Sequence, residues 1–162
     1  MNYWLIKSEP DVFGIEEMKA AGTEPWDGIR NYQARNFMRD EMEIGDLALF
    51  YHSNTKPPGV AGVVKVASKC YPDPTQFDKK SKYYDEKSKE DNPRWLLVDF
   101  EFVCEMPKYV SLDELKSEAE GKLEGMLTLR KGNRLSVMPL EKKHFTVVCK
   151  MGGIQKVTDL DK

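Results

Sequence analysis

Short apolar segments separated by turn residues open the chain. Tyr3 to Ser8 has the apolar density of a buried strand, and Ile15 to Ala21 has the apolar spacing of a short helix that Gly22 ends. The side chain of Asn31 can accept a hydrogen bond from a backbone N–H two or three residues on, so it is a suitable N-cap. The pattern therefore predicts a second helix over residues 32–42, with its apolar side chains turned to a core.

The middle of the chain alternates between strand-like segments and polar connections. Leu47 to Tyr51 predicts one strand, and Val60 to about Cys70 predicts a longer one. From Tyr71 to Asn92 the sequence is rich in Pro, Asp, Lys and Ser without a clear period, which indicates an extended excursion with little regular structure. Strand character returns from Trp95 to Met106.

The last third of the chain predicts short helices. Ser111 and Glu114 have the spacing of a capping box. In this motif the serine side chain accepts a hydrogen bond from the backbone N–H of the glutamate, and the glutamate side chain accepts one from the backbone N–H of the serine. Residues 123–129 predict another helical turn or two. Pro139 is placed as an early residue of a last helix that ends at Gly152.

This order of elements favours an α+β fold. It contains no repeating βαβ unit, which excludes a doubly wound parallel sheet. A small, strongly bent sheet of antiparallel or mixed strands is expected, closing toward a barrel with short helices at its ends. The length of 162 residues suits one domain over 1–162 that buries a core without disulfides or metals.

Composition excludes several classes of protein. With 40% hydrophobic and 32% charged residues, the chain has no apolar run near the roughly 20 residues of a membrane span, and its N-terminus does not resemble a secretory signal. Cys70, Cys104 and Cys149 are odd in number and far apart, which suits reduced thiols and predicts a cytoplasmic location. Neither histidine has metal-ligand spacing and no glycine-rich phosphate loop is present, so we expect no metal and no cofactor.

The charge is balanced overall and uneven locally. A formal net charge of -2 argues against binding nucleic acid through a global basic field. Arg30, Arg35 and Arg39 nevertheless lie close together, and lysines crowd residues 79–89. Two interpretations stay open for these residues, a mixed solvated surface and a local patch that contacts phosphates.

Two stretches have the composition of a binding pocket. The run from Trp26 to Asn36 combines aromatic, amide and guanidinium side chains, which is unusual for a segment that only builds a core. The strand ending in Phe50-Tyr51-His52-Ser53-Asn54 again places aromatic side chains before hydrogen-bonding ones. We expect these stretches to form two walls of one polar and aromatic pocket.

Further motifs are spread over nearly the whole chain: Trp4-Leu5-Ile6-Lys7-Ser8-Glu9-Pro10, the Trp26 to Asn36 run, Gly45-Asp46, the Phe50 to Asn54 stretch, Tyr71-Pro72-Asp73, Tyr84-Asp85, Pro93-Arg94-Trp95, Arg130 and Leu135-Ser136-Val137. Together they resemble the motifs of the EVE domain family. The resemblance implies a PUA-like pseudobarrel, related to the PUA, ASCH and YTH folds. It also implies a non-enzymatic module without a cofactor that recognises modified DNA bases, notably methylated or oxidised cytosine.

The chemistry of a flipped base agrees with this implication. An extruded base presents two flat faces and one edge of donors and acceptors, and its extrusion costs a few kcal/mol. Stacking on one aromatic ring contributes roughly 1 to 3 kcal/mol, so we expect Trp26 as one wall and Phe50 or Tyr51 as the other. Arg30 and Arg35 are expected on flanking phosphates. The expected base-binding pocket comprises Ser8, Trp26, Asn31, Tyr32, Phe50, Tyr51, His52 and Ser53.

Other interpretations stay open at this point. Trp26 is also explained as a core tryptophan with a bonded indole N–H, and Arg35 with Asn36 as a structural tie. The substrate could be a modified RNA base, since contacts to the 2′-OH separate RNA from DNA. A nucleotide-like metabolite could instead be bound, or hydrolysed through His52 with Asp73 or Asp85, although no catalytic constellation supports hydrolysis.

Overall fold

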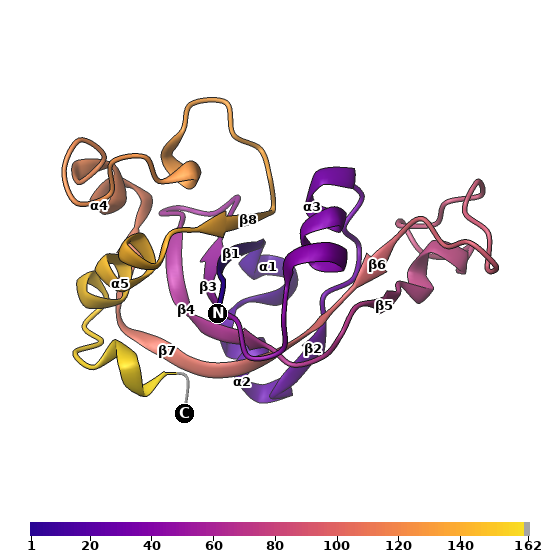
Figure 1. Ribbon diagram of the computed structural model, residues 1–162, viewed down its shortest axis with the longest axis horizontal. Helices are drawn as coiled ribbons and strands as arrows, with labels where there is room; N and C mark the ends of the chain where they lie inside the picture. Colours follow the sequence, from indigo (N-terminus) through magenta and orange to yellow (C-terminus); the bar gives the residue numbers. More distant parts are fainter. Residues whose placement is uncertain (161–162) are drawn as a thin grey trace.

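The structure, a computed structural model, describes residues 1–160 and contains a curled six-stranded sheet (Figure 1). The strand order is β2-β7-β4-β3-β1-β8; β1 runs parallel to β3, and the other neighbours are antiparallel. Its strands are β1 (Tyr3–Ser8), β2 (Thr23–Pro25), β3 (Leu47–His52), β4 (Gly59–Val66), β7 (Asp99–Ser111) and β8 (Val137–Leu140). A separate two-stranded sheet joins β5 (Tyr71–Pro72) to β6 (Leu96–Leu97). The expected α+β class with a bent, mixed sheet is confirmed.

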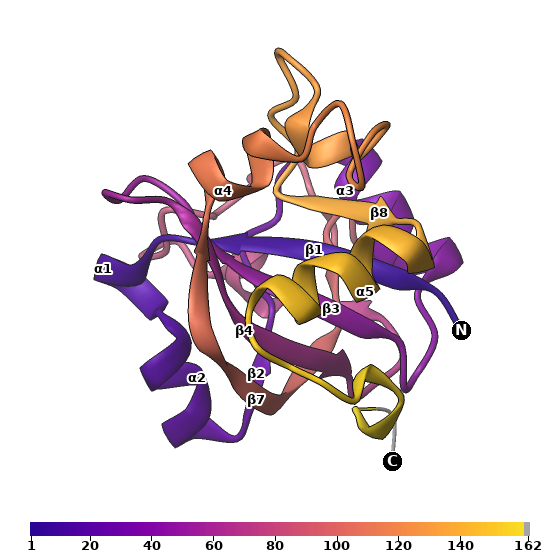
Figure 2. The same cartoon turned by 90° about the vertical axis from the view of Figure 1, so that its left-hand side faces the viewer.

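Short helices flank the curled sheet on both sides (Figures 1 and 2). None of the helices within residues 1–160 has the length and apolarity needed to cross a membrane. The helices are α1 (Pro10–Phe13), α2 (Ile15–Ala21), α3 (Tyr32–Asn36), the π-helix η1 (Phe37–Glu41), α4 (Leu112–Ser117) and α5 (Lys142–Met151), with 3-10 turns η2 (Pro74–Phe77), η3 (Leu127–Leu129) and η4 (Val157–Asp159).

The sheet separates two apolar clusters. Because successive strand residues point to opposite faces, β3 sends Phe50 into one cluster and Tyr51 into the other. The first cluster also contains Trp4 and Trp26, and α2 and α3 contribute to it. The second cluster contains Phe145 of α5 and is completed by α4 and the C-terminal segment.

Several local predictions are confirmed. Helix α2 has the predicted bounds, and the Asn31 side chain accepts a hydrogen bond from the Ala34 amide at 3.0 Å. The predicted helix over 32–42 is α3 continued by a π-helical turn. Ser111 and Glu114 form the capping box of α4.

Other boundaries differ from the prediction. Pro139 does not begin a helix; it lies in β8, opposite Trp4, and α5 begins at Lys142. Strand β8 is an edge strand, where the missing proline N–H leaves no ladder bond unmade. The predicted strand to Cys70 ends at Val66, and the strand from Trp95 is divided into β6 and a long β7 that continues to Ser111.

Candidate functional site

A hollow of about 600 Å³ opens where β1 ends. Three segments are joined there: the Ser53 amide donates to the Ser8 carbonyl at 2.9 Å, and the Lys7 amide donates to the Ser136 carbonyl at 2.9 Å. Residues 24–29 close another side of the hollow. We call this hollow the pocket; its lining residues are Lys7, Ser8, Glu9, Val12, Phe13, Glu24, Pro25, Trp26, Asp27, Gly28, Ile29, Ser53, Lys82, Tyr83, Arg134 and Ser136.

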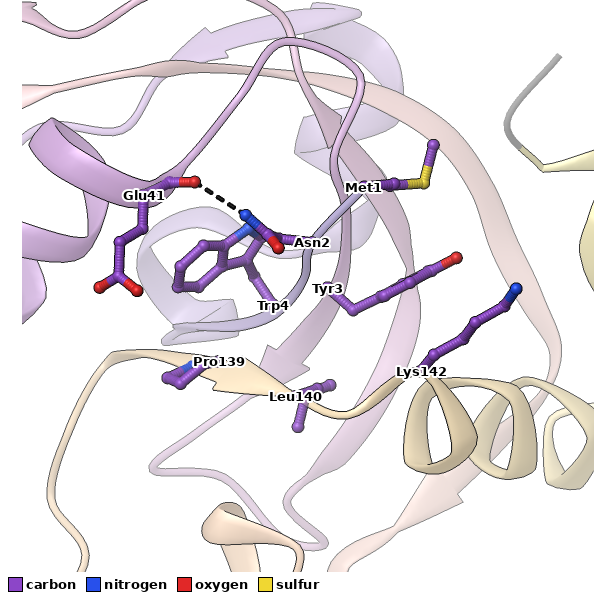
Figure 3. Close-up of a pocket in the computed structure, with 8 residues that line it drawn as sticks. All are labelled: Met1, Asn2, Tyr3, Trp4, Glu41, Pro139, Leu140 and Lys142. Atoms are coloured by element: carbon purple, nitrogen blue, oxygen red, sulfur yellow. Dashed lines mark hydrogen bonds between the residues drawn. The ribbon is translucent and has the colours of Figure 1, made fainter.

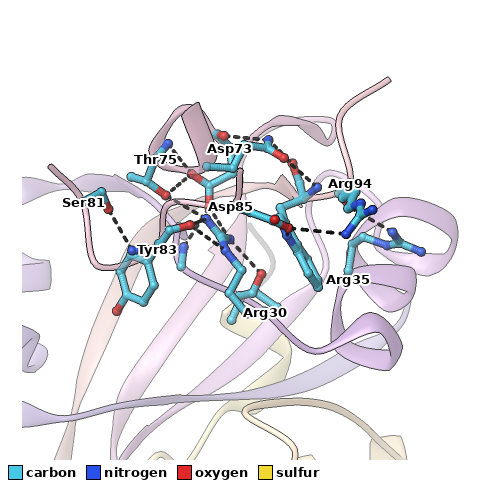
Figure 4. Close-up of polar contacts among 12 residues, drawn as sticks. Arg30, Arg35, Asp73, Thr75, Ser81, Tyr83, Asp85 and Arg94 are labelled. Atoms are coloured by element: carbon cyan, nitrogen blue, oxygen red, sulfur yellow. Dashed lines mark hydrogen bonds and ion pairs between the residues drawn. The ribbon is translucent and has the colours of Figure 1, made fainter. Parts of the chain in front are cut away.

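A polar network beside the pocket fixes the chain after Trp26 (Figure 4). At its centre is Asp73, whose carboxylate has no solvent exposure and accepts from the Gly28 amide at 2.8 Å and from Arg30 Nη1 at 3.0 Å. Burial alone would raise the pKa of Asp73, but hydrogen bonds from Thr75, Gly28 and Arg30 outweigh it and lower the pKa. We call Gly28, Arg30, Asp73, Thr75, Tyr83, Asp85 and Trp95 the clasp.

The Arg30 guanidinium is fully engaged within the clasp. Its Nε and Nη2 donate to the Tyr83 carbonyl at 3.1 and 2.7 Å, and Nη2 also donates to Thr75 Oγ1 at 3.1 Å. Its Nη1 donates to the Ile29 carbonyl at 2.9 Å and to Asp73. A guanidinium has no further N–H groups. Arg30 therefore has no N–H left to donate to a phosphate, which argues against the phosphate contact expected from the sequence.

Arg35 has the structural role that was one of the two interpretations of the sequence: it connects α3 to the segment at Arg94. Its Nε and Nη2 donate to Asn36 Oδ1 at 3.1 and 2.8 Å, and its Nη1 donates to the Arg94 carbonyl at 2.8 Å. The guanidinium lies over the Tyr32 ring, 4.7 Å from the centroid. Tyr32 is itself stacked on Trp95, with ring centroids 4.8 Å apart, so both predicted residues lie outside the pocket.

Of the predicted base-binding residues, the pocket brings Ser8, Trp26 and Ser53 together. Phe50 is fully buried in the first cluster and meets Trp26 edge-on at 5.7 Å, so it cannot offer a face to a ligand. Tyr51 points into the cluster on the other side of the sheet. Both placements argue against Phe50 or Tyr51 as a wall of the pocket.

Asn31 and His52 also have structural roles. The Asn31 side chain caps α3 and does not line the pocket. His52 Nε2 accepts a hydrogen bond from the Ile15 amide at 3.1 Å. Burial lowers the pKa of His52, and the nearby Glu17 only partly opposes that effect, so the imidazole is held neutral.

The two carboxylates considered as acid partners of His52 in hydrolysis, Asp73 and Asp85, are engaged elsewhere. Asp73 is the centre of the clasp, and Asp85 accepts from the indole N–H of Trp95 at 2.8 Å. Each carboxylate is therefore committed to a structural donor, and the hydrogen bonds to His52 involve neither.

The pocket contains functional candidates that the sequence analysis did not select. Phe13 and Tyr83 are the partly exposed aromatic side chains on its wall. Lys82 and Arg134 are exposed at its rim, and neither has a carboxylate partner in the described part of the chain. Their sequence neighbourhoods lack regular structure, so only the folded arrangement brings 82–83 and 134 to the same opening.

Charged groups of both signs line the pocket. Burial, reinforced by Asp73 and opposed by Arg30, raises the pKa of Asp27. Burial and the carboxylates of Asp27 and Asp99 raise the pKa of Glu24. Burial lowers the pKa of Lys7, whose ammonium lies 5.8 Å from the centroid of the Tyr51 ring. The pocket thus holds acceptors on one side and cations at its rim.

A second hollow, of about 420 Å³, lies at the opposite end of β1 (Figure 3). Its wall includes Trp4, but the indole N–H of Trp4 already donates to Asp46 at 3.0 Å. The Asn2 side chain is likewise engaged, with the Glu41 carbonyl at 3.0 Å. These groups serve the fold, so this hollow is a weaker candidate than the pocket.

Comparison with known proteins adds independent information. A family model of the EVE domain matches residues 2–151. Thymocyte nuclear protein 1 of Rattus norvegicus is 46% identical over 163 residues, which cover 91% of this chain and 72% of that protein. The chain is also similar to solved structures. One is a crystal structure of human THYN1 protein in complex with 5-methylcytosine-containing DNA, with a TM-score of 0.89, 44% identity, and coverage of 94% of this chain and 98% of that one.

Two further structures complete the comparison. A hypothetical protein from Leishmania major has a TM-score of 0.89 and 43% identity, covering 96% of this chain and 97% of its own. A Zymomonas mobilis ASCH protein has a TM-score of 0.54 at 11% identity, which shows a shared fold alone.

Proposed function

The chain belongs to the EVE domain family, and from that premise we propose that it is a non-enzymatic nucleic-acid-binding module. Its pocket accepts a flipped modified base, and the preferred base is a 5-substituted cytosine in DNA. The similar human THYN1 protein was crystallised with 5-methylcytosine-containing DNA, which supports both the polymer and the modification. We further propose a cytoplasmic location, supported by the three free cysteines.

One observation carries the proposal. The pocket combines aromatic side chains with polar groups that have no hydrogen-bond partner within residues 1–160, namely the Ser53 hydroxyl and the Arg134 guanidinium, in a chain that superposes over 94% of its length on a DNA-bound relative. Its volume of about 600 Å³ lies within the range of small-ligand sites, ~300 to 1,000 Å³.

The walls of the pocket suggest how a base would be held. Phe13 and Tyr83 offer ring surface for its faces, and stacking of this kind contributes roughly 1 to 3 kcal/mol per base. Ser8 ends β1 and Ser53 follows β3. The Ser8 hydroxyl donates to the Phe13 carbonyl, so its oxygen remains as an acceptor for the base edge, and the Ser53 hydroxyl has no hydrogen-bond partner within residues 1–160. Lys82 and Arg134 at the rim replace Arg30 and Arg35 as the residues for flanking phosphates.

A binding assay with matched oligonucleotides tests the proposal. Fluorescently labelled strands that differ only in one cytosine or 5-methylcytosine are compared as single strands, as duplexes and as ribose versions. We expect tighter binding to the 5-methylcytosine DNA, and a loss of that preference in Phe13→Ala. Lys116→Ala is the control, since Lys116 is exposed on α4 and does not line the pocket. Equal affinity for every oligonucleotide would overturn the proposal, and a preference for the ribose versions would assign the pocket to RNA.

A further inference from the structure

The indole N–H of Trp26 differs from those of the other two tryptophans. Trp4 donates to Asp46 at 3.0 Å, and Trp95 donates to Asp85 at 2.8 Å. Within residues 1–160, the indole N–H of Trp26 has no acceptor. Only 7% of the Trp26 surface is exposed, so this polar group lies on a side chain that is otherwise buried.

The accessible part of Trp26 must include its N–H. In the part of the chain that the structure describes, no side-chain nitrogen or oxygen is both sealed from solvent and without a hydrogen-bond partner. Since the Trp26 N–H has no partner, solvent reaches it, and the opening that Trp26 lines is the pocket. A ligand that covers this N–H without offering it an acceptor loses binding free energy, because the N–H then gives up its hydrogen bond to solvent.

The small exposed surface of Trp26 also limits how it can touch a ligand. Its ring packs in edge-to-face contacts with Phe13, Phe50 and Phe100 at 6.4, 5.7 and 5.6 Å. A ring held on three sides, with 7% of its surface exposed, presents an edge and not a free face. Hydrogen bonding is therefore a better use of Trp26 than the stacking expected from the sequence.

The next residue supplies the complementary group. Asp27 lines the same pocket and is exposed; its carboxylate accepts from its own backbone amide, and no other residue within 1–160 donates a hydrogen bond to it. A carboxylate accepts hydrogen bonds, and acceptance from the exocyclic amino group of cytosine is one of its usual pairings. Donor and acceptor thus stand on consecutive residues at one wall.

We propose that Trp26 and Asp27 determine which base edge the pocket accepts: the indole N–H donates to a ring nitrogen or carbonyl oxygen, and the Asp27 carboxylate accepts from an exocyclic amino group. The pocket then selects an amino-bearing pyrimidine over its oxo counterpart. This inference rests on the proposed function and specifies the substrate class of the same site.

A matched pair of bases tests the inference on the natural chain. 5-Methylcytosine and thymine carry the same methyl group and differ in the 4-amino or 4-oxo group and in the proton on N3. Placed at one position of the same oligonucleotide, they should differ in affinity by about tenfold or more in favour of 5-methylcytosine, as one good base-edge contact allows. Equal affinity for the two bases would overturn the inference, while a preference of both over unmodified cytosine would leave the proposed function standing.

Two variants assign the contacts. Asp27→Ala should reduce the preference for 5-methylcytosine over thymine to less than threefold, with an unchanged or higher melting temperature, because a carboxylate with a raised pKa is removed. Trp26→Phe keeps an aromatic ring in the core and removes the N–H, so it should weaken binding of both bases about fivefold or more. Trp4→Phe is the control: it removes an indole N–H bonded to Asp46 at the other end of β1, so its melting temperature should fall while its affinity is unchanged.

Binding by the variants tests the two contacts, and binding by the wild-type chain tests the proposed function. If Asp27→Ala binds 5-methylcytosine as tightly as the wild type does, with unchanged selectivity over thymine, the assignment of Asp27 is overturned. The same affinity in a folded Trp26→Phe would overturn the assignment of Trp26. If Trp26→Phe does not fold, Asp27→Ala and the natural chain still decide the matter. Failure of the wild-type chain to bind any of the oligonucleotides would instead overturn the proposed function.

Discussion

In the clasp, the Arg30 guanidinium donates every N–H to a protein acceptor, whereas on the other side of Gly28 the indole N–H of Trp26 has no acceptor among the described residues, 1–160. Both regions combine aromatic, cationic and carboxylate side chains within a few residues of one another. The difference is that the clasp is closed on itself and the pocket is not. Similar composition can therefore serve stability in one place and recognition in the next, and the hydrogen-bond partners tell them apart.

The largest effect that tests this comparison is expected at the centre of the clasp. Asp73→Ala leaves the Arg30 guanidinium and the Gly28 amide without their acceptor, and breaking a buried ion pair costs about 3 to 5 kcal/mol. The measurement is the free energy of unfolding in urea. Asp40→Ala is the control, because the Arg39–Asp40 pair is exposed and should matter little.

The same variant has a predicted dependence on pH. The pKa of Asp73 is lowered in the folded protein, so its contribution is present above the unfolded pKa and is lost as pH falls through the folded value. The stability difference between wild type and Asp73→Ala should therefore shrink toward acid. A difference independent of pH would show that the charge of Asp73 does not support the clasp.

A smaller loss of stability is expected at the boundary between the two regions. Gly28 has a φ of 83°, and a Cβ there would lie 2.5 Å from the Tyr83 ring. Gly28→Ala should cost about 2 to 3 kcal/mol, combining backbone strain with overpacking. Gly132→Ala is the matched control, since its φ is 82° and nothing lies within 4 Å of its Cβ. Equal losses in the two variants would mean that Tyr83 simply moves aside.

These tests also indicate where the sequence was informative about the fold. Local chemistry predicted the bounds of α2, the Asn31 cap and the capping box at Ser111, because each depends on residues within one turn. The position of Pro139 was missed because it depends on pairing with β1, more than a hundred residues earlier. Non-local pairing is not visible in a local pattern.

The candidate site was predicted in part for the same reason. Trp26, Ser8 and Ser53 were found from composition and resemblance, and they do meet at the pocket. The protein partners of Arg30 could not be predicted, because they lie in the irregular excursion at Asp73 and Tyr83. Arg134 was not selected because only the folded chain brings it beside residue 82.

On the pocket side of the comparison, Arg134→Ala should affect binding and not stability. Its side chain is exposed at the rim and has no carboxylate partner in the part of the chain that the structure describes, so its loss should leave the melting temperature unchanged. If it contacts a phosphate, affinity should fall by about 1 kcal/mol, and the slope of log K against log salt should decrease by about 1. An unchanged salt dependence would remove Arg134 from the phosphate contacts. A paired measurement on Lys116→Ala, away from the pocket, controls for net charge.

The smallest expected effect concerns His52, a residue predicted for the pocket that behaves like a member of the clasp. Its Nε2 accepts from the Ile15 amide, and burial lowers its pKa, so the folded protein prefers the neutral imidazole. The unfolded chain then binds more protons near its ordinary pKa, and stability is complete above about pH 6.5 and declines as pH falls through the lowered folded value. His52→Gln should flatten this decline by under about 1 kcal/mol, the size of one hydrogen bond. Unfolding in urea at pH 5 and pH 7.5 measures it, with affinity for 5-methylcytosine DNA recorded at pH 7.5. A large loss of affinity without loss of stability would return His52 to the pocket and weaken the division between the two regions.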